Sequence, residues 1–239
     1  MIKKRFLSVL AAGLFILTIA GSANATLTTI GTATYGGSNY NLIWDDDNNG
    51  NSVIWLDYTN SAASWSDQKA WAAGLDAQLT YNIDPAYNVI WDDPAWRLPS
   101  TVDGTYVLGF DGTTTAGYNI TTSEMGHLYY TELGNLGYYD TSGNGPQSGW
   151  GLNNTGDFEN LIASWYWSGT EYAYFPGFAW GFGMDSGYQR HHYEGNHYYG
   201  LAVRSGQVSA VPVPGAIWLF GSGLAGMVAL GRRRKGNRV

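Results

Sequence analysis

The chain has 239 residues, no cysteine, and a composition rich in aromatic residues, with 11 tryptophans and 18 tyrosines. Without cysteine it can form neither a disulfide bond nor a thiol nucleophile, and no lipid can be attached at a signal-peptide cysteine. All 19 acidic residues lie between residues 26 and 211, where the basic residues are only Lys69, Arg97, Arg190 and Arg204, a formal charge of −15. Because such a surface repels phosphate backbones, the composition argues against nucleic acid as a partner and favours cations or neutral sugars.

The first 25 residues have the order of a secretory signal peptide. A basic run at residues 3–5 precedes an apolar stretch at residues 6–20, and the small-residue sequence Ala23-Asn24-Ala25 follows. This order predicts export through the Sec machinery and cleavage by signal peptidase between Ala25 and Thr26. An ordinary buried helix is the alternative, but it explains neither the basic start nor the cleavage sequence.

Two strands and a helix are predicted early in the middle region. Residues 42–44 and 53–56 are apolar and flank a polar stretch at residues 45–51, which predicts two strands joined by a turn. Ser64-x-x-Asp67 has the pattern of an N-cap with an acidic first turn, and it predicts a helix that extends to Leu75.

A second helix and a group of strands follow. Thr121-x-x-Glu124 matches a capping box, and Gly134 can end the helix that begins there. Its apolar face comprises Met125, Leu128, Tyr129 and Leu133. After a polar loop at residues 141–156, apolar residues alternate with the period of a strand at 165/167, 180/182/184 and 199/201/203. Two helices with an aromatic antiparallel sheet predict one α+β domain over residues 26–210.

Several segments of this domain, in their order along the chain, resemble the Lcl C-terminal-like domain family. Its most specific marks are Trp96-Arg97-Leu98-Pro99 and Tyr166-Trp167-Ser168-Gly169-Thr170. The other matching segments are Trp55-Leu56-Asp57-Tyr58, the helix around residues 65–75, Ser123-Glu124-Met125, Ala179-Trp180 with Phe182, and Ala202-Val203-Arg204. The resemblance implies a C-type-lectin-like fold and adhesion to glycans. Specificity for sulfated polysaccharide needs a basic surface, which this acidic domain lacks.

Asp45-Asp46-Asp47-Asn48-Asn49-Gly50 matches the first half of a calcium-binding loop, with oxygen ligands at Asp45, Asp47 and Asn49. An EF-hand is excluded because Leu56 stands where its bidentate Glu is required. Two hypotheses stay open: a simpler Ca²⁺ site formed by these oxygens, or a polar turn whose side chains bond to their own backbone.

Other side chains are expected to be structural. His191, His192, Glu194 and His197 have metal-ligand chemistry, but their spacing matches no zinc signature, and we expect exposed loop histidines. Arg97 and Arg204 are expected in buried ion pairs. The tryptophans at 55, 96, 165, 167 and 180 are expected in the core.

Four tyrosines are candidates for direct contact with sugars. Tyr172, Tyr174, Tyr193 and Tyr198 lie in polar stretches and are predicted to form an exposed rim whose rings can stack on sugar faces. The sequence carries no motif of a known catalytic site, so no catalytic residue is predicted.

The C-terminal segment, residues 211–239, has three parts in a fixed order. Val211-Pro212-Val213-Pro214 precedes an apolar run at residues 215–231, and Arg232, Arg233, Arg234 and Lys235 follow. The apolar run predicts a transmembrane helix about 25 Å long, with the basic run on the cytoplasmic side. The order resembles the PEP-CTERM sorting signal, with Val213 in place of the usual Glu, and implies processing by the transpeptidase exosortase. A permanent single-pass anchor is the alternative.

These features predict an exported protein of a Gram-negative bacterium, anchored in the inner membrane as a precursor and then placed at the cell surface or in the extracellular matrix. We expect a non-enzymatic adhesion module that contacts exopolysaccharide. Two alternatives stay open: a structural coat protein without a specific ligand, and a matrix glycoside hydrolase whose paired carboxylates sequence spacing cannot locate.

Overall fold

The computed structural model describes residues 27–212. The signal peptide at residues 1–25, its cleavage between Ala25 and Thr26, and the sorting tail from Val213 onward, with its apolar run at 215–231, lie outside the described residues and stay predictions. Between residues 27 and 212, no helix is long and apolar enough to span a bilayer.

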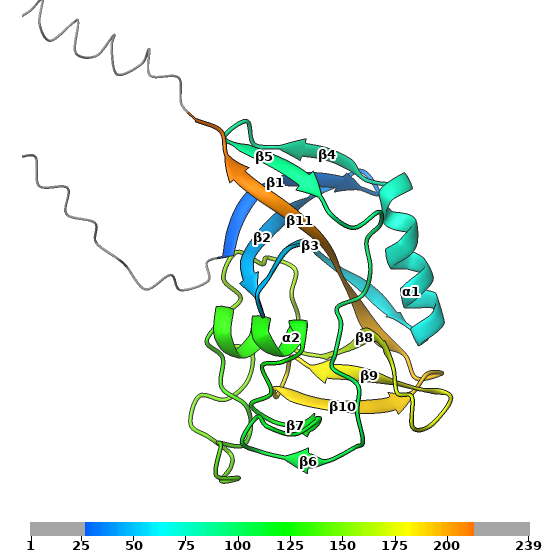
Figure 1. The fold of residues 1–239 in the computed structure, drawn as a ribbon, viewed down its shortest axis with the longest axis vertical. Coiled ribbons are helices and arrows are strands. Elements are labelled where there is room, and N and C mark those ends of the chain that lie inside the picture. The colour runs from blue at the N-terminus through cyan, green and yellow to red at the C-terminus, as the bar shows by residue number, and fades with distance from the viewer. Residues whose placement is uncertain (1–26, 213–239) are drawn as a thin grey trace, which may run out of the picture.

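One sheet of eleven strands forms the framework of the described region (Figure 1). Its strands are hydrogen-bonded in the order β4-β1-β2-β3-β11-β8-β9-β10-β7-β6, and β5 pairs with the second half of β11. In chain order the strands are β1 (Leu27–Tyr35), β2 (Ser38–Asn48), β3 (Asn51–Ala63), β4 (Thr80–Ile83), β5 (Tyr87–Trp91), β6 (Leu108–Gly109), β7 (Ala116–Gly117), β8 (Trp165–Glu171), β9 (Phe178–Gly183), β10 (Tyr188–Tyr193) and β11 (Tyr198–Ala210). The sheet and two short helices confirm the α+β class. The expectation of a purely antiparallel sheet is wrong, because β11 pairs with β8, and β6 with β7, in parallel.

The β2–β3 hairpin confirms the two strands predicted at residues 42–44 and 53–56. Its turn is Asn49-Gly50, with φ of 53° and 80°, the left-handed conformations that a two-residue hairpin turn requires. The predicted turn at residues 45–51 is therefore too long. β2 continues through Asp45 to Asn48, so the residues of the expected calcium loop lie mostly on a strand.

The central strands β3 and β11 are buried on both faces of the sheet. Trp55 packs on one face in a core cluster that includes Met125 of the second helix. Ile54 packs on the other face with Leu75, which follows the first helix. A strand buried on both faces needs apolar residues at successive positions, which explains the unbroken run at residues 53–56.

α1 (Trp65–Gly74) begins where the sequence predicts. The hydroxyl of Ser64 accepts a hydrogen bond from the backbone N–H of Asp67, and one 3₁₀ turn, Leu75–Ala77, follows the helix. Trp65 and Ala72 of α1 lie in one core cluster with Trp167 of β8 and Ala179 of β9, and the helix lies beside β11 (Figure 1).

α2 (Glu124–His127) begins at a different cap from the one predicted. The side chain of Ser123 accepts the capping bond from Gly126 N–H, so the predicted capping box at Thr121 is wrong. The helix continues as a π-helical turn, Leu128–Glu132, before Gly134 adopts φ of 62°. The four apolar residues predicted for its buried face all lie in one core cluster.

Candidate functional site

The two most specific family-like segments meet in space and hold each other in position. The guanidinium of Arg97 donates two hydrogen bonds to the carboxylate of Glu124, at 2.6 and 2.8 Å, and Ser100 N–H donates to the same carboxylate at 2.6 Å. Ser168 Oγ donates to the carbonyl of Pro99 at 2.9 Å. Burial alone would lower the pKa of Arg97, but the bonds and the charge of Glu124 raise it. The predicted ion pair of Arg97 forms, but its guanidinium side chain is 36% exposed and not buried as predicted.

The tryptophans of these segments are core residues, as predicted. Trp96 and Trp167 are fully buried, and their ring N–H groups donate to Tyr81 Oη at 2.8 Å and to the Ala63 carbonyl at 3.1 Å. Trp55 and Trp180 are also fully buried. Trp165 is only partly buried, which corrects the prediction for that residue.

Arg204 also forms the buried ion pair that the sequence predicts. Its Nη1 lies 2.5 Å from a carboxylate oxygen of Asp76, and its guanidinium lies 4.5 Å from the ring centre of Trp91. Because both contacts fix the guanidinium inside the fold, this arginine has a structural role.

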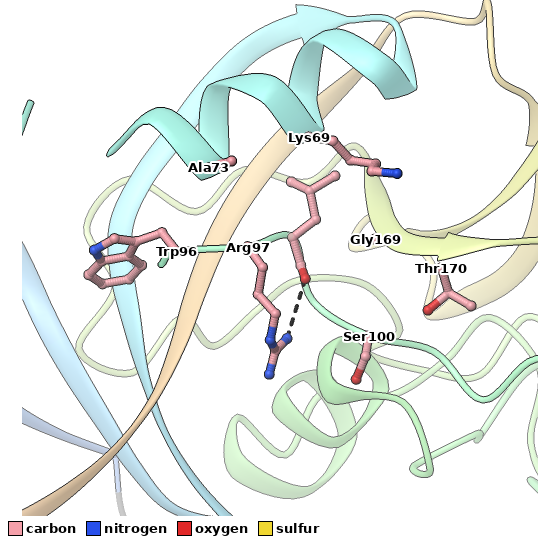
Figure 2. A pocket seen from close by; sticks show the side chains of 8 residues that line it. Lys69, Ala73, Trp96, Arg97, Ser100, Gly169 and Thr170 are labelled. Carbon is pink, nitrogen blue, oxygen red and sulfur yellow. Dashed lines mark hydrogen bonds between the residues drawn. The ribbon is translucent and has the colours of Figure 1, made fainter. Parts of the chain in front are cut away.

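A pocket of about 270 Å³ has Arg97 in its wall (Figure 2). α1 contributes Lys69, and the segment after Arg97 contributes Leu98 and Ser100. The ammonium of Lys69 lies 3.8 Å from the ring centre of Trp65 and forms no ion pair with any residue between 27 and 212. The pocket therefore offers apolar walls, two residues with a hydroxyl, Ser100 and Thr170, and two cationic ones, Arg97 and Lys69, and none of the described residues that line it is acidic.

A cluster of aromatic side chains lies where β8, β9 and β10 end, and we call it the aromatic patch. Tyr174, Phe175 and Tyr193 expose 61%, 59% and 58% of their surfaces. Phe178 joins them, since its ring centre lies 5.1 Å from that of Phe175 and 6.0 Å from that of Tyr193. Tyr172 completes the patch, 5.8 Å from Tyr174. Exposed aromatic clusters of this kind mark interaction sites on soluble domains.

Two of the four predicted rim tyrosines are exposed, and two are not. Tyr174 and Tyr193 lie in the aromatic patch with most of their surface in solvent. Tyr172 is buried because its ring stacks on His191, with ring centres 4.3 Å apart and planes within 6°. Tyr198 is partly buried because its ring packs 4.8 Å from that of Trp167. The prediction of an exposed rim is therefore wrong for Tyr172, which is buried. Tyr198 is only partly exposed and lies outside the aromatic patch.

His191 and His192 are partly buried on a strand, which corrects the prediction of exposed loop histidines for these two, whereas His197 is an exposed loop residue as predicted. His191 and His192 belong to β10 and point to opposite faces, as the period of a strand requires. His192 packs 4.5 Å from the ring of Trp165, and its Nδ1 lies 3.0 Å from Tyr198 Oη. Burial, with the charge of Arg190, lowers the pKa of His192 to about 4. Between residues 27 and 212, no three His, Asp or Glu side chains are arranged to hold a metal.

The residues of the expected calcium loop differ in their surroundings. Asp45 is fully buried, and its Oδ2 accepts bonds from Asn48 Nδ2 at 2.8 Å and Trp55 Nε1 at 3.2 Å. Asp47 is exposed, and its Oδ1 accepts a bond from Gly50 N–H at 2.8 Å. The bond to Gly50 is the turn-stabilising contact of the alternative hypothesis.

Glu132 and Asp45 form a buried acidic cluster with His127, which sequence spacing does not reveal. The side chain of Glu132 is 1% exposed, and its Oε1 lies 3.1 Å from Nε2 of His127. Asp45 Oδ1 and Glu132 Oε2 are buried without a hydrogen-bond partner in the described region. Burial, followed by the charges of Asp45, Asp46 and Asp47, raises the pKa of Glu132 to about 7. The cluster therefore retains a proton near neutral pH.

Comparison with known proteins adds no relative. No family model, curated protein or solved structure matches the chain.

The sequence analysis did not identify Phe175 and Phe178, which also belong to the aromatic patch. The run of aromatic residues between 172 and 178 was the signal that could have found them.

Proposed function

We propose that this chain is an exported surface or matrix protein whose folded region binds glycan without catalysing a reaction. The observation that carries the proposal is the aromatic patch, where Tyr174, Phe175 and Tyr193 keep more than half of their surface in solvent. Covering such rings with the face of a sugar removes apolar surface from water, which is favourable. Aromatic side chains also lose little conformational entropy on binding, because they have few rotatable bonds. Tyrosine hydroxyls at the edge can bond to sugar hydroxyls.

The charge of the domain narrows the class of glycan. The described region contains four basic side chains, and Arg97 and Arg204 are held in ion pairs with Glu124 and Asp76. The domain therefore has few cations to offer a sulfated or phosphorylated polymer. A neutral or weakly charged exopolysaccharide fits this balance better.

The resemblances found in the sequence support the same proposal. Likeness to the Lcl C-terminal-like family implies a C-type-lectin-like adhesion domain, and likeness to the PEP-CTERM signal implies transfer by exosortase after Sec export.

The intact mass of the exported protein tests the proposed export and sorting. We expect a chain that starts at Thr26 and ends near residues 211–215. A mass that includes Arg232 to Val239 would instead indicate the permanent anchor.

A matrix glycoside hydrolase is the main rival. Such enzymes place two carboxylates on either side of a bound sugar, one of them with a raised pKa. The pKa of Glu132 is raised to about 7, but its side chain is only 1% exposed, so a polymer cannot reach it. Release of new reducing ends from the producer's exopolysaccharide would favour the enzyme over the binding module.

Capture on immobilised exopolysaccharide from the producing strain tests the binding half. Tyr174→Ala and Tyr193→Ala each remove an exposed ring, and we expect each to weaken capture by about 2- to 10-fold, the range for one aromatic contact. Trp150→Ala is the matched control, because Trp150 is 40% exposed and lies outside the patch. Equal losses in all three variants, or none in the tyrosine variants, would refute the proposal. The second result would favour a coat protein.

A further inference from the structure

A second pocket lies away from every residue that the sequence singled out as a ligand contact. It has a volume of about 270 Å³ and opens beside three neighbouring strands, with Tyr40 on β2, Tyr58 on β3 and Tyr199 on β11. Thr59 and Asn160 contribute polar groups to its wall. The described residues that line it carry no charge. In a domain of net charge −15, an uncharged pocket of this kind is a local exception.

The hydroxyl groups around this pocket are available to a ligand. The phenol groups of Tyr40, Tyr58 and Tyr199 and the Oγ of Ser61 form no hydrogen bond with any residue between 27 and 212. A phenol or a serine hydroxyl can donate one bond and accept others. The residues that line the pocket therefore include three phenols and one serine hydroxyl without a partner among the described residues, and groups of this kind supply both the donors and the acceptors that sugar hydroxyls need.

The walls of the pocket are held in place by contacts behind them. Asp57, which is buried, accepts bonds from the backbone N–H groups of Glu159 and Asn160, both at 2.9 Å. Thr59 Oγ1 donates to the Asn160 carbonyl at 2.6 Å. These bonds fix the loop that carries Asn160, so little conformational freedom is lost when a ligand binds.

The aromatic rings are fixed in the same way. The ring of Tyr58 meets the rings of Tyr35 and Tyr40 edge to face, with centres 5.0 and 4.8 Å apart. Burial, with the neighbouring phenols of Tyr35 and Tyr40, raises the pKa of Tyr58, so its hydroxyl stays neutral. The pocket thus offers rigid rings together with neutral donors.

We infer that this pocket binds one neutral sugar unit. Its volume lies just below the range typical of drug-sized ligands, which suits a single hexose. The absence of charge among its described lining residues selects against a uronate or a sulfated sugar. The inference deepens the proposed glycan binding by naming the sugar class, but it uses residues that are separate from the aromatic patch.

Ligand-observed NMR titration of the full-length protein tests the inference. The probes are the methyl glycosides of glucose, galactose, mannose and N-acetylglucosamine, with sodium glucuronate as the charged counterpart. We expect at least one neutral glycoside to bind with Kd on the order of 1 mM, as the size of the ligand permits. Glucuronate is expected to bind at least 10-fold more weakly.

Phenylalanine variants identify the pocket while keeping its rings. Tyr40→Phe, Tyr58→Phe and Tyr199→Phe each remove one hydroxyl, and each should raise Kd about 3- to 10-fold, the effect of one neutral hydrogen bond. Tyr35→Phe is the matched control, because Tyr35 contacts Tyr58 but does not line the pocket. The inference is overturned by no binding of any neutral glycoside, by tighter binding of glucuronate, or by an equal loss in Tyr35→Phe.

The two glycan proposals fail separately. Capture on exopolysaccharide that needs Tyr174 and Tyr193, without binding of any neutral methyl glycoside, would overturn only the pocket. Glycoside binding that needs Tyr40, Tyr58 and Tyr199, with no effect of the patch variants on capture, would support the pocket and overturn the patch.

Discussion

Replacing Glu132 with Gln tests the buried acidic cluster through the pH dependence of stability. In the folded chain the pKa of Glu132 is raised from 4.5 to about 7, by burial first and then by the charges of Asp45, Asp46 and Asp47. Between these two pH values the unfolded chain has released a proton that the folded chain retains. The free energy of unfolding therefore falls as the pH rises through this window, and the loss is complete above pH 7.

The size of the effect follows from the shift in pKa. A rise from 4.5 to about 7, at 1.36 kcal/mol per pH unit, corresponds to roughly 3 kcal/mol. Solvent screening reduces this little, because the side chain is 1% exposed. Glu132→Gln removes the ionisation and keeps the shape of the side chain. We expect the variant to match the wild type at pH 4.5 and to exceed its stability by about 3 kcal/mol at pH 8.

Urea unfolding of the full-length chain at pH 4.5, 6 and 8 measures this difference. Glu171→Gln is the matched control, because it makes the same substitution at an exposed carboxylate. The imidazole of His127 contacts Glu132, so the comparison is repeated in a His127→Gln background. Equal losses of stability between pH 4.5 and 8 in the wild type and in Glu132→Gln would refute the reasoning.

Three further predictions concern the core, the ion pair and calcium. Trp96→Ala and Trp167→Ala should each cost about 3–5 kcal/mol in thermal unfolding, as for other large buried aromatic residues, and a cost below about 1 kcal/mol would contradict their place in the core. Glu124→Gln removes the closer of the two carboxylates that pair with Arg97, leaves Asp93 at 3.5 Å, and should cost about 1–3 kcal/mol by urea unfolding, with the lower end expected because the guanidinium is partly exposed. The calcium hypothesis requires that millimolar Ca²⁺ raise the melting temperature and that Asp45→Asn with Asp47→Asn remove the shift, whereas identical curves with Ca²⁺ and with chelator would eliminate it.

Short sequence patterns were sufficient to predict those helices and strands whose ends are set by nearby turn and cap residues. The β2–β3 hairpin follows from two apolar runs around Asn49-Gly50, and α1 follows from the cap at Ser64. The start of α2 was placed wrongly because Thr121 and Ser123 are both good caps, and only tertiary packing decides between them. β10 was missed because Arg190, His191 and His192 give no apolar alternation, although aromatic rings cover both histidines.

The candidate sites depend on pairings that local patterns do not determine. Tyr40 and Tyr199 share one pocket only because β3 pairs with both β2 and β11. Likewise, the charge of Asp45 raises the pKa of Glu132 only because the β2–β3 hairpin packs against the π-helical turn that carries Glu132. In both cases the sequence shows the residue types, whereas the register between distant strands and helices decides which of them meet.

The pairing of β11 also determines how the domain responds to mechanical force. β11 has 13 residues and is bonded to β3 along its first part and to β5 along its second. Just beyond the strand, Val211 N–H donates to the Ala86 carbonyl at 2.8 Å. Hydrogen bonds between antiparallel strands lie perpendicular to the strand axis, so tension applied along β11 from residue 212 loads many of them together in shear. Resistance to such tension is governed by the rate of unfolding under force, and a domain held at this end by a polymer would withstand flow better than one whose last strand peels away bond by bond.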